Sequence, residues 1–391
     1  MSHLRTPAAS YQAELISIRR DLHQHPELAF KEIRTAGVIC NHLDAIGVEY
    51  RKGVAETGVV ALIKGNRPGK IVMLRFDMDA LPIEEETDAE YKSLNEGVMH
   101  ACGHDGHVAI GITVAKMIAS NRDFPGSVKL IFQPAEEGLG GAERMIREGA
   151  LQDPKPDMCF ALHLWNEMPL GWLGIHEGPL MAGSEIFTIR ILGQGGHGGM
   201  PDQVIDPVVA SAHVITAIQT IISRNLPPLE SAVISICTIH GGSTHNVVPS
   251  YVDLSGTIRF YRPEIRDLIN SQFESIVRHA ANALGCSAEI VITPLTPPVM
   301  SEKFASDIVI NAAQRLFPEL EIDTRYQVMV SEDMAFMLEK IPGCYFLVGS
   351  ANTSMGLCYS HHHPKFDFDE RALGIAAELM TEAALLFLNE K

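Results

Sequence analysis

Ile71-Val-Met-Leu-Arg-Phe-Asp-Met-Asp79 is a short apolar run that ends in two acidic residues. The same pattern recurs at 128–137, where apolar residues run into two glutamates, and at 157–163, where they run into a histidine. Runs of this length and composition are typical of buried strands. In open α/β sheets, ligands bind at the carboxyl ends of the strands. The repeated pattern therefore predicts an α/β fold with a functional site at that edge of the sheet.

The stretch His100-Ala-Cys-Gly-His-Asp-Gly-His107 brings three histidines, one cysteine and one aspartate into eight residues. Such side chains are ligands for zinc or a related divalent ion. Gly103 and Gly106 allow the backbone to turn tightly, and an apolar helical pattern starts at Val108. We expect a metal site at this loop-to-helix junction. A histidine-rich turn with one buried cysteine is the alternative interpretation.

Helical patterns surround the expected strands. Apolar periodicity favours helices at 10–23, 33–46, 301–316 and 370–388, and acidic residues indicate the first turn of another helix from Ser331. These helices are expected to flank the sheet.

The pattern changes near residue 180. Over 184–293 the expected order is β-α-β-β-α-β, which is typical of a small α+β sandwich. The proline-rich stretch 293–298 is a plausible return hinge. We therefore expect a catalytic domain formed by 1–182 and 296–391, interrupted by an inserted domain at 183–295.

Composition limits the classes of function. The chain has 391 residues, 46% hydrophobic and 20% charged, which indicates a folded protein of two domains. Its net charge of −17 argues against nucleic acid and anionic membrane as partners. Seven cysteines without a CxxC pair favour a reducing compartment. The stretch 1–10 has no long apolar segment, and Val208–Ile222 is too polar and short to span a bilayer, so a cytoplasmic protein is expected.

Several motifs together carry a family resemblance. They include Arg75-Phe-Asp-Met-Asp-Ala-Leu-Pro82, His100-Ala-Cys-Gly-His-Asp105 and Phe132-Gln-Pro-Ala-Glu-Glu137. Other matching stretches are 21–28, 161–163, 195–198, 246–249, 256–259, 331–333 and 362–370. The chain resembles the M20 family of metal-dependent peptidases and amidohydrolases, in the branch of hippurate hydrolases, N-acyl-amino-acid amidohydrolases and auxin-conjugate hydrolases. The resemblance implies a zinc-peptidase-like catalytic domain with a mixed, largely parallel sheet and an inserted lid or dimerisation domain.

The resemblance also implies two divalent ions, of zinc, manganese, cobalt or nickel, held by five ligands: Cys102, His104, Glu137, His163 and His362. His362 is chosen over its two histidine neighbours because of the His-x-Pro match, and a histidine-rich surface turn is the alternative. Cys102 as a catalytic nucleophile is a further alternative, which would require a nearby base and an oxyanion hole.

Other roles follow from position and resemblance. Glu136, next to a ligand, is the expected general base, unless both glutamates are ligands or it forms a structural ion pair. Asp79 is expected to orient a ligand or the reacting water, and the role of Asp77 is left open. Other M20 branches have His-x-Asp where this chain has Asp77-Met-Asp79. His197 is the expected oxyanion donor, acting across a dimer interface or on domain closure, unless it is only an exposed loop histidine.

Arg259 is a candidate to bind the substrate's α-carboxylate, with Asn246 beside it, and each has a structural role at a strand end as the alternative. The expected reaction is hydrolysis of N-acetyl, N-benzoyl or similar N-acyl amino acids by a homodimer or homotetramer. A dipeptidase or carboxypeptidase of the same family, a non-catalytic relative that binds small acylated amino acids, and a cysteine-dependent hydrolase are the alternatives.

Overall fold

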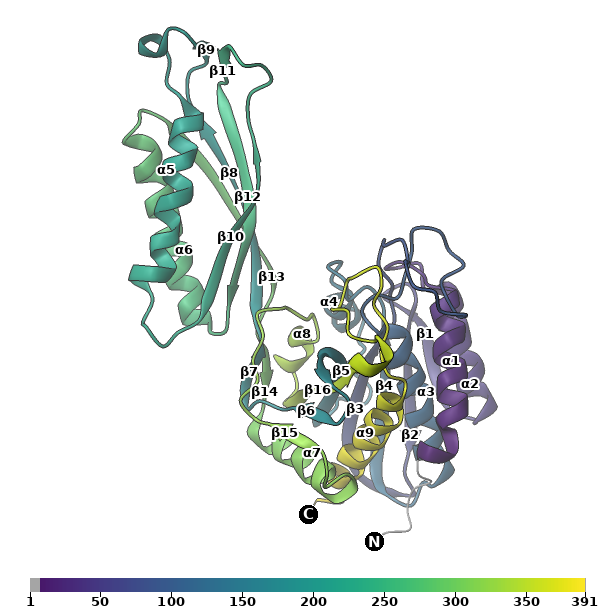
Figure 1. Ribbon diagram of the computed structural model, residues 1–391. Helices are drawn as coiled ribbons and strands as arrows, with labels where there is room; N and C mark the ends of the chain where they lie inside the picture. The colour runs from purple at the N-terminus through teal and green to yellow at the C-terminus, as the bar shows by residue number, and fades with distance from the viewer. Residues whose placement is uncertain (1–7, 391) are drawn as a thin grey trace. The chain divides into compact units, whose positions relative to one another are not determined.

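The computed structural model describes residues 8–390 (Figure 1). The chain divides into two compact units. Unit 1 comprises Met1–Leu180, Met300–Gln327 and Asp333–Lys391, and unit 2 comprises Met181–Val299 and Val328–Glu332. The stretch 1–10, which has no long apolar segment in the sequence, lies mostly outside the described residues.

Unit 1 is built on an eight-stranded sheet in the order β1-β2-β4-β3-β5-β16-β6-β15. Its strands are β1 (Glu49–Val54), β2 (Gly58–Lys64), β3 (Arg67–Asp77), β4 (Pro125–Gln133), β5 (Met158–Pro169), β6 (Trp172–Gly174), β15 (Glu321–Asp323) and β16 (Gly343–Ala351). The central strands β4, β3, β5 and β16 are parallel, whereas β1 and β2 are antiparallel to their neighbours. The expected mixed, largely parallel α/β sheet is confirmed. Because the central strands are parallel, their carboxyl ends meet at one edge.

Helices cover the sheet of unit 1. They are α1 (Gln12–Gln24), α2 (Ile33–Ala45), α3 (His104–Ser120), α4 (Gly141–Arg147), α7 (Lys303–Leu316), α8 (Ala335–Leu338) and α9 (Arg371–Asn389), with a 3-10 turn at Ala8–Tyr11. Helices α3 and α9 pack against each other and against β3, and α1 packs on α3. Apolar residues of these helices and of the central strands form one continuous core.

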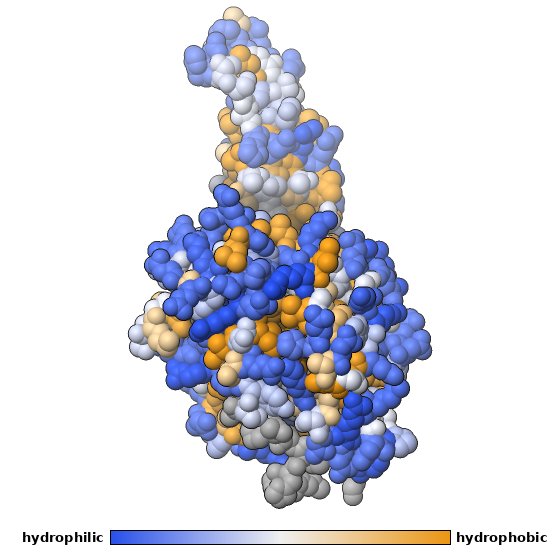
Figure 2. Space-filling view, turned by 90° about the vertical axis from the view of Figure 1, so that its right-hand side faces the viewer, coloured by the Kyte–Doolittle hydropathy of each residue, from blue (hydrophilic) through white to orange (hydrophobic). Residues whose placement is uncertain are grey.

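Among the described residues, α9 alone is long and apolar enough to cross a membrane. Its apolar side chains, including Leu373, Met380 and Phe387, are instead buried in the core of unit 1. The hydrophobicity of α9 is therefore explained by its packing against the sheet and α3. On the face shown in Figure 2, hydrophilic residues predominate and hydrophobic ones appear in smaller groups between them.

Two local expectations are wrong. The helix expected from Ser331 is only the single turn α8, and the acidic residues Glu332 and Asp333 precede it. Asp333 instead accepts backbone and side-chain hydrogen bonds from Ala142 and Gln133. Strand β5 does not end at His163 but continues to Pro169, since β16 continues to pair with it there.

Unit 2 contains a four-stranded antiparallel sheet in the order β10-β12-β8-β13. Its elements are β8 (Gly183–Leu192), α5 (Pro207–Thr220), a π-helical turn (Ile221–Asn225), β10 (Ala232–His240), β12 (Tyr251–Phe260), α6 (Pro263–Asn282) and β13 (Ser287–Thr296). Both helices pack on one face of this sheet around Phe187 and Phe273. The short strands β9 (Gly196–His197) and β11 (Val247–Val248) form a separate ladder, and 3-10 turns lie at Pro201–Gln203 and, in unit 1, Thr353–Met355. Strands β7 (Gly178–Met181) and β14 (Val299–Ser301) pair where the chain passes between the units.

Candidate metal centre

The carboxyl edge of the unit 1 sheet carries the cluster that the sequence indicates. Cys102 lies in the loop before α3, and His104 is the first residue of that helix. Gly103 between them has φ +91°, in the left-handed region that glycine adopts without strain. His163 comes from the middle of β5, and Glu137 follows β4. The loop-to-helix junction and the neighbouring strands thus bring together side chains that are distant in sequence.

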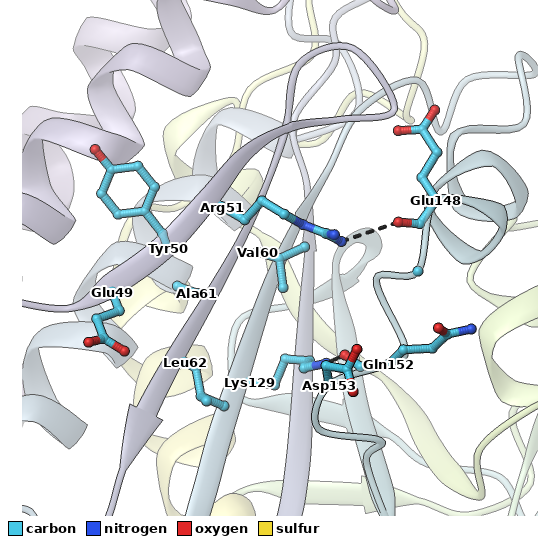
Figure 3. A pocket seen from close by; sticks show the side chains of 11 residues that line it. Glu49, Tyr50, Arg51, Val60, Ala61, Leu62, Lys129, Glu148, Gln152 and Asp153 are labelled. Atoms are coloured by element: carbon cyan, nitrogen blue, oxygen red, sulfur yellow. Dashed lines mark hydrogen bonds between the residues drawn. The ribbon is translucent and has the colours of Figure 1, made fainter.

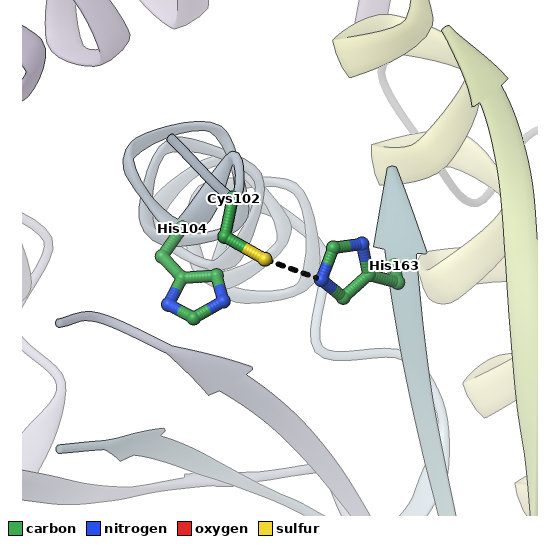
Figure 4. A group of neighbouring side chains, drawn as sticks. All are labelled: Cys102, His104 and His163. Atoms are coloured by element: carbon green, nitrogen blue, oxygen red, sulfur yellow. Dashed lines mark hydrogen bonds between the residues drawn. The ribbon is translucent and has the colours of Figure 1, made fainter. Parts of the chain in front are cut away.

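The ligand atoms of Cys102, His104 and His163 lie within 4.8 Å of one another. Cys102 Sγ is 3.5 Å from His163 Nε2 (Figure 4). His104 Nδ1 lies 2.9 Å from the Asp79 carbonyl oxygen and His163 Nδ1 lies 2.6 Å from that of Leu164, so each Nδ1 is the donor. Each Nε2 is therefore left to offer its lone pair, because in metal-binding histidines a hydrogen bond from one ring nitrogen commonly frees the other for the metal.

A second group overlaps the first. Ligand atoms of Cys102, Glu137 and His362 also lie within 4.8 Å of one another, as do those of His104, Glu136 and Glu137. Glu137 Oε1 is 3.2 Å from His362 Nε2. Among the described residues, buried His104 Nε2 has no hydrogen-bond partner, and buried Glu137 Oε1 makes no hydrogen bond of good geometry although His362 Nε2 lies beside it. Two overlapping groups that share Cys102, with buried lone pairs left unsatisfied, fit two neighbouring cations.

The electrostatics of the cluster also favour a cation. Burial, together with Glu137 and Glu136, raises the pKa of the Cys102 thiol well above its usual range. Burial opposes a charge on His104, but Asp77 and Asp79 raise its pKa to about 10. Burial lowers the pKa of His163 well below its usual range, which keeps it neutral. The cluster therefore attracts positive charge, and a divalent ion would supply it while stabilising the thiolate.

The three adjacent histidines 361–363 have different surroundings. His361 is stacked on Trp165 and donates from Nε2 to the Leu164 carbonyl oxygen at 2.9 Å. His363 lies against Tyr359, and its Nδ1 accepts from the Lys365 backbone N–H. His362 alone among them reaches Glu137, with its backbone at φ +65°. The structure thus brings the residue chosen from the His-x-Pro match to the cluster.

Asp77 and Asp79 have supporting positions. Asp77 accepts from His107 Nδ1 and from Arg75, and it lies 3.8 Å from His104 Nε2. His107 Nε2 accepts from the Leu164 backbone N–H, so both of its ring nitrogens are occupied and it is not free to bind a metal. Asp79 accepts from the backbone N–H groups of the two glutamates that follow β4, at 3.1 and 3.0 Å. Asp79 therefore orients the turn that carries them.

Glu136 lies beside Glu137, next to the cluster. A carboxylate oxygen of Glu136 lies within 4.8 Å of a ring nitrogen of His104 and of a carboxylate oxygen of Glu137. Glu136 Oε1 also accepts from the Asp333 backbone N–H at 3.4 Å. A carboxylate in this position can exchange a proton with a water held at the cluster.

The remaining predicted residues lie in unit 2. His197 is exposed on β9, paired with Val247, and the neighbouring Gly198 N–H donates to the Asn246 carbonyl oxygen at 2.8 Å. Arg259 pairs with Ser184 where the chain enters the sheet, and its Nη1 donates to Ser331 Oγ at 2.7 Å. Arg259 lies near the end of β12, whereas the β9–β11 ladder with His197 lies beyond its start. At about 3.3 Å per residue, the length of β12 puts roughly 26 Å between Arg259 and that ladder. Within a single chain, unit 2 therefore brings His197 and Asn246 together but does not bring Arg259 beside them.

Sequence reasoning missed several residues that support the cluster. Arg19 bonds to Asp105 and Asp367, and Glu32 bonds to the Ala135 backbone, across long sequence separations. Arg75 bonds to Gln133, three residues before Glu136. Of these residues, only Arg19 left a signal in the sequence. It is a charged residue on the helix face that also carries Leu15 and Leu22.

A largely parallel sheet that carries overlapping groups of metal-ligand side chains at one edge is typical of a metal-dependent enzyme. The chain belongs to peptidase family M20/M25/M40, whose family model matches residues 73–386. Similar proteins include thermostable carboxypeptidase 1 of Saccharolobus solfataricus, 38% identical with 96% of each chain covered. The N-acetylcysteine deacetylase of Bacillus subtilis is 36% identical, with 97% of this chain and 98% of that protein covered.

The YXEP protein of Bacillus subtilis, described as a dinuclear metal-binding peptidase of the M20 family, has a similar solved structure. It superposes with a TM-score of 0.85 at 34% sequence identity, covering 97% of this chain and 99% of that one. The family resemblance expected from the motifs and the α/β fold are confirmed by these comparisons.

Proposed function

We propose that the chain hydrolyses the amide bond of N-acyl amino acids, with acetyl, benzoyl or similar acyl groups, to a carboxylate and a free amino acid. The observation that carries the proposal is Glu136, a carboxylate next to two overlapping ligand groups. The similarity to an N-acetylcysteine deacetylase supports the substrate class.

The proposed ligands are Cys102, His104, Glu137, His163 and His362, holding two divalent ions. Such ions, when bound, lower the pKa of a coordinated water towards ~7 and polarise the substrate carbonyl. Glu136 takes a proton from the water while the water oxygen attacks the amide carbon. The C–N bond then breaks, and Glu136 passes the proton to the leaving amine. Asp79 maintains the turn in which Glu136 lies.

A peptidase is the second candidate. The relatives at 38% identity include a carboxypeptidase, and a dipeptide has the same amide and free carboxylate as an N-acyl amino acid. The two candidates differ in the group on the acyl side of the scissile bond, which is a free α-amine only in the dipeptide.

A substrate screen tests both candidates. Protein stripped with a chelator is reloaded with zinc, manganese, cobalt or nickel and given N-acetyl and N-benzoyl amino acids beside dipeptides. Metal-restored release of amino acid from the N-acyl series supports the proposal, and turnover of dipeptides alone supports the peptidase. Activity that survives the chelator would instead indicate a cysteine-dependent hydrolase.

The general base is tested by Glu136→Gln. The variant keeps the size and hydrogen bonding of the side chain but cannot accept the proton, so kcat is expected to fall by about 10²–10⁴-fold while metal content is unchanged. Glu143→Gln is the control, since Glu143 is exposed in the first turn of α4. Normal turnover by the Glu136→Gln variant would exclude Glu136 as the base.

We also propose that His197 and Asn246 act from a second copy of the chain, with His197 as oxyanion donor, while Arg259 binds the substrate carboxylate from its own chain. The separation of these residues within one unit 2 supports this arrangement. A small substrate that touches Arg259 would lie out of reach of the same chain's His197. The proposed enzyme is therefore a homodimer or a higher oligomer built from such pairs.

A further inference from the structure

The turn that carries Glu136 and Glu137 contains a strained residue. Ala135 has φ +54°, in the left-handed region, although it is not a glycine. A Cβ atom makes this conformation unfavourable, so it persists only where the surroundings hold it. Ala135 is fully buried and directly precedes the proposed base.

Carboxyl groups hold the strained turn in place. The Ala135 backbone N–H donates to Glu32 Oε1 at 3.0 Å, and the next two N–H groups donate to the two oxygens of Asp79. The Ala135 carbonyl oxygen accepts from the Gly141 N–H at 3.0 Å. Successive N–H groups converge on anionic groups when the backbone alternates between right- and left-handed conformations. Here the protein's own acidic side chains accept from them.

Glu32 is the part of this arrangement that comes from a distant element. It is fully buried just before α2, and its Oε2 accepts from Thr57 Oγ1 at 2.6 Å. Neither oxygen has a lysine, arginine or histidine partner among residues 8–390. Burying a carboxyl group in this way costs free energy, which indicates that its two hydrogen bonds have a specific role.

We propose that Glu32 is a positioning residue for the metal centre. By accepting from the Ala135 N–H, it holds Ala135 in the left-handed conformation that presents Glu136 and Glu137 to the ligand cluster. The inference rests on the proposed function for the effect on catalysis. Its effect on metal binding depends only on Glu137 as a ligand.

The decisive experiment is a double-variant cycle of Glu32→Ala and Ala135→Gly. Without the acceptor, Ala135 is expected to leave the left-handed region and displace the glutamates. The Glu32→Ala variant should then lose about 10–100-fold in kcat and in zinc affinity, while KM changes little. Glycine adopts positive φ without strain, so the double variant should recover most of both losses, and Ala135→Gly alone should resemble the wild type. A merely structural role of Glu32 would not be rescued by a change at residue 135.

Two further variants complete the test. Glu32→Gln keeps an oxygen that accepts from the Ala135 N–H. Because this hydrogen bond would still hold the turn, kcat should stay within about threefold of the wild type. Glu27→Ala is the matched control, since Glu27 also accepts backbone N–H groups, from Arg34 and Thr35, but these belong to α2. It should destabilise the fold without changing kcat. If Glu32→Ala does not fold, Glu32→Asp, which is one methylene shorter, replaces it in the cycle.

The outcomes separate this inference from the proposed function. If the wild type hydrolyses none of the substrates, zinc titration and amide hydrogen exchange of residues 136–138, whose N–H groups donate to Asp79 and within the turn, still report on the turn. Weaker zinc binding and faster exchange in Glu32→Ala, both reversed by Ala135→Gly, support the positioning role whatever the substrate. Zinc affinity and exchange equal to those of the wild type, or losses that Ala135→Gly does not reverse, would overturn it.

Discussion

Arg19 Nε lies 2.8 Å from Asp105 Oδ2, and neither side chain is exposed to solvent. Asp105 is in the first turn of α3, next to His104. The same guanidinium bonds to Asp367 at 2.7 Å, five residues after His362. One arginine of α1 thus connects the two segments that carry Cys102 and His362. Arg19 therefore contributes to both the stability of unit 1 and the arrangement of its ligands.

Replacement of Arg19 by methionine is expected to destabilise the protein by about 3–5 kcal/mol, because it leaves buried carboxylates without their partner. Arg20→Met is the control. Arg20 bonds to Glu370, but its side chain is 43% exposed, so the loss there should be about 1 kcal/mol or less. Denaturant unfolding of both variants at the same zinc concentration measures the difference. Equal destabilisation of the two would show that burial of the Arg19 pair has no special weight.

His104 and His107 are one helical turn apart but are expected to respond in opposite ways to substitution. His104→Ala removes an unpaired Nε2 from the cluster, so the metal bound per subunit should fall, with a modest change in stability. His107→Ala leaves the Leu164 N–H and the Oδ1 atom of Asp77 without their hydrogen-bond partner, which should cost about 1–3 kcal/mol for each unsatisfied group. Its metal stoichiometry should remain that of the wild type. Metal analysis after dialysis, together with unfolding, measures both properties, and loss of metal from His107→Ala alone would reverse the assignment.

The proposed second copy is tested by mixing two inactive variants, Glu136→Gln and His197→Ala. If each site combines Glu136 of one chain with His197 of its partner, a mixed dimer has one intact site. Random mixing of the subunits of such a symmetric dimer should restore roughly a quarter of wild-type activity. If both residues act within one chain, no mixture regains activity. Subunit exchange is verified with differently tagged chains, and mixing of Glu136→Gln with Glu136→Ala is the negative control.

The sequence predicted the sheet and the ligand cluster because both leave local signals. Buried parallel strands are continuous apolar runs, and β3 ends in Asp77, β5 contains His163, and the two glutamates of the site closely follow β4. Glu32 left no such signal, because its partner Ala135 is 103 residues away. The length of α8 and the continuation of β5 beyond His163 were also missed, since they depend on hydrogen bonds to distant segments. Local pattern thus predicted the side chains of the ligand cluster, and tertiary contacts determine the groups that hold those side chains in place.

Lys129 gives a prediction about the pH dependence of stability, far from the metal ligands. It lines a cavity of about 360 Å³ at the β1-β2-β4 edge of the sheet (Figure 3), and its Nζ donates to the carbonyl oxygens of Ala150 and Gln152. Only 2% of the residue is exposed. Burial and, to a lesser degree, Arg51 lower the pKa of Lys129 to about 8, from 10.5.

A lowered pKa means that the unfolded chain binds this proton more tightly than the folded protein does. Between pH 8 and 10.5 the unfolded state carries more of the proton, so the contribution of Lys129 to stability rises with pH across this window. Lys129→Met should remove that rise, which amounts to at most about 1.4 kcal/mol for each pH unit. Denaturant unfolding at intervals from pH 7.5 to about 10 measures the slope, with Lys52→Met of neighbouring β1 as the control for a lost positive charge. Because other groups that titrate in this range are common to all three proteins, the difference in slope reports on Lys129, and identical slopes for Lys129→Met and the wild type would contradict the lowered pKa.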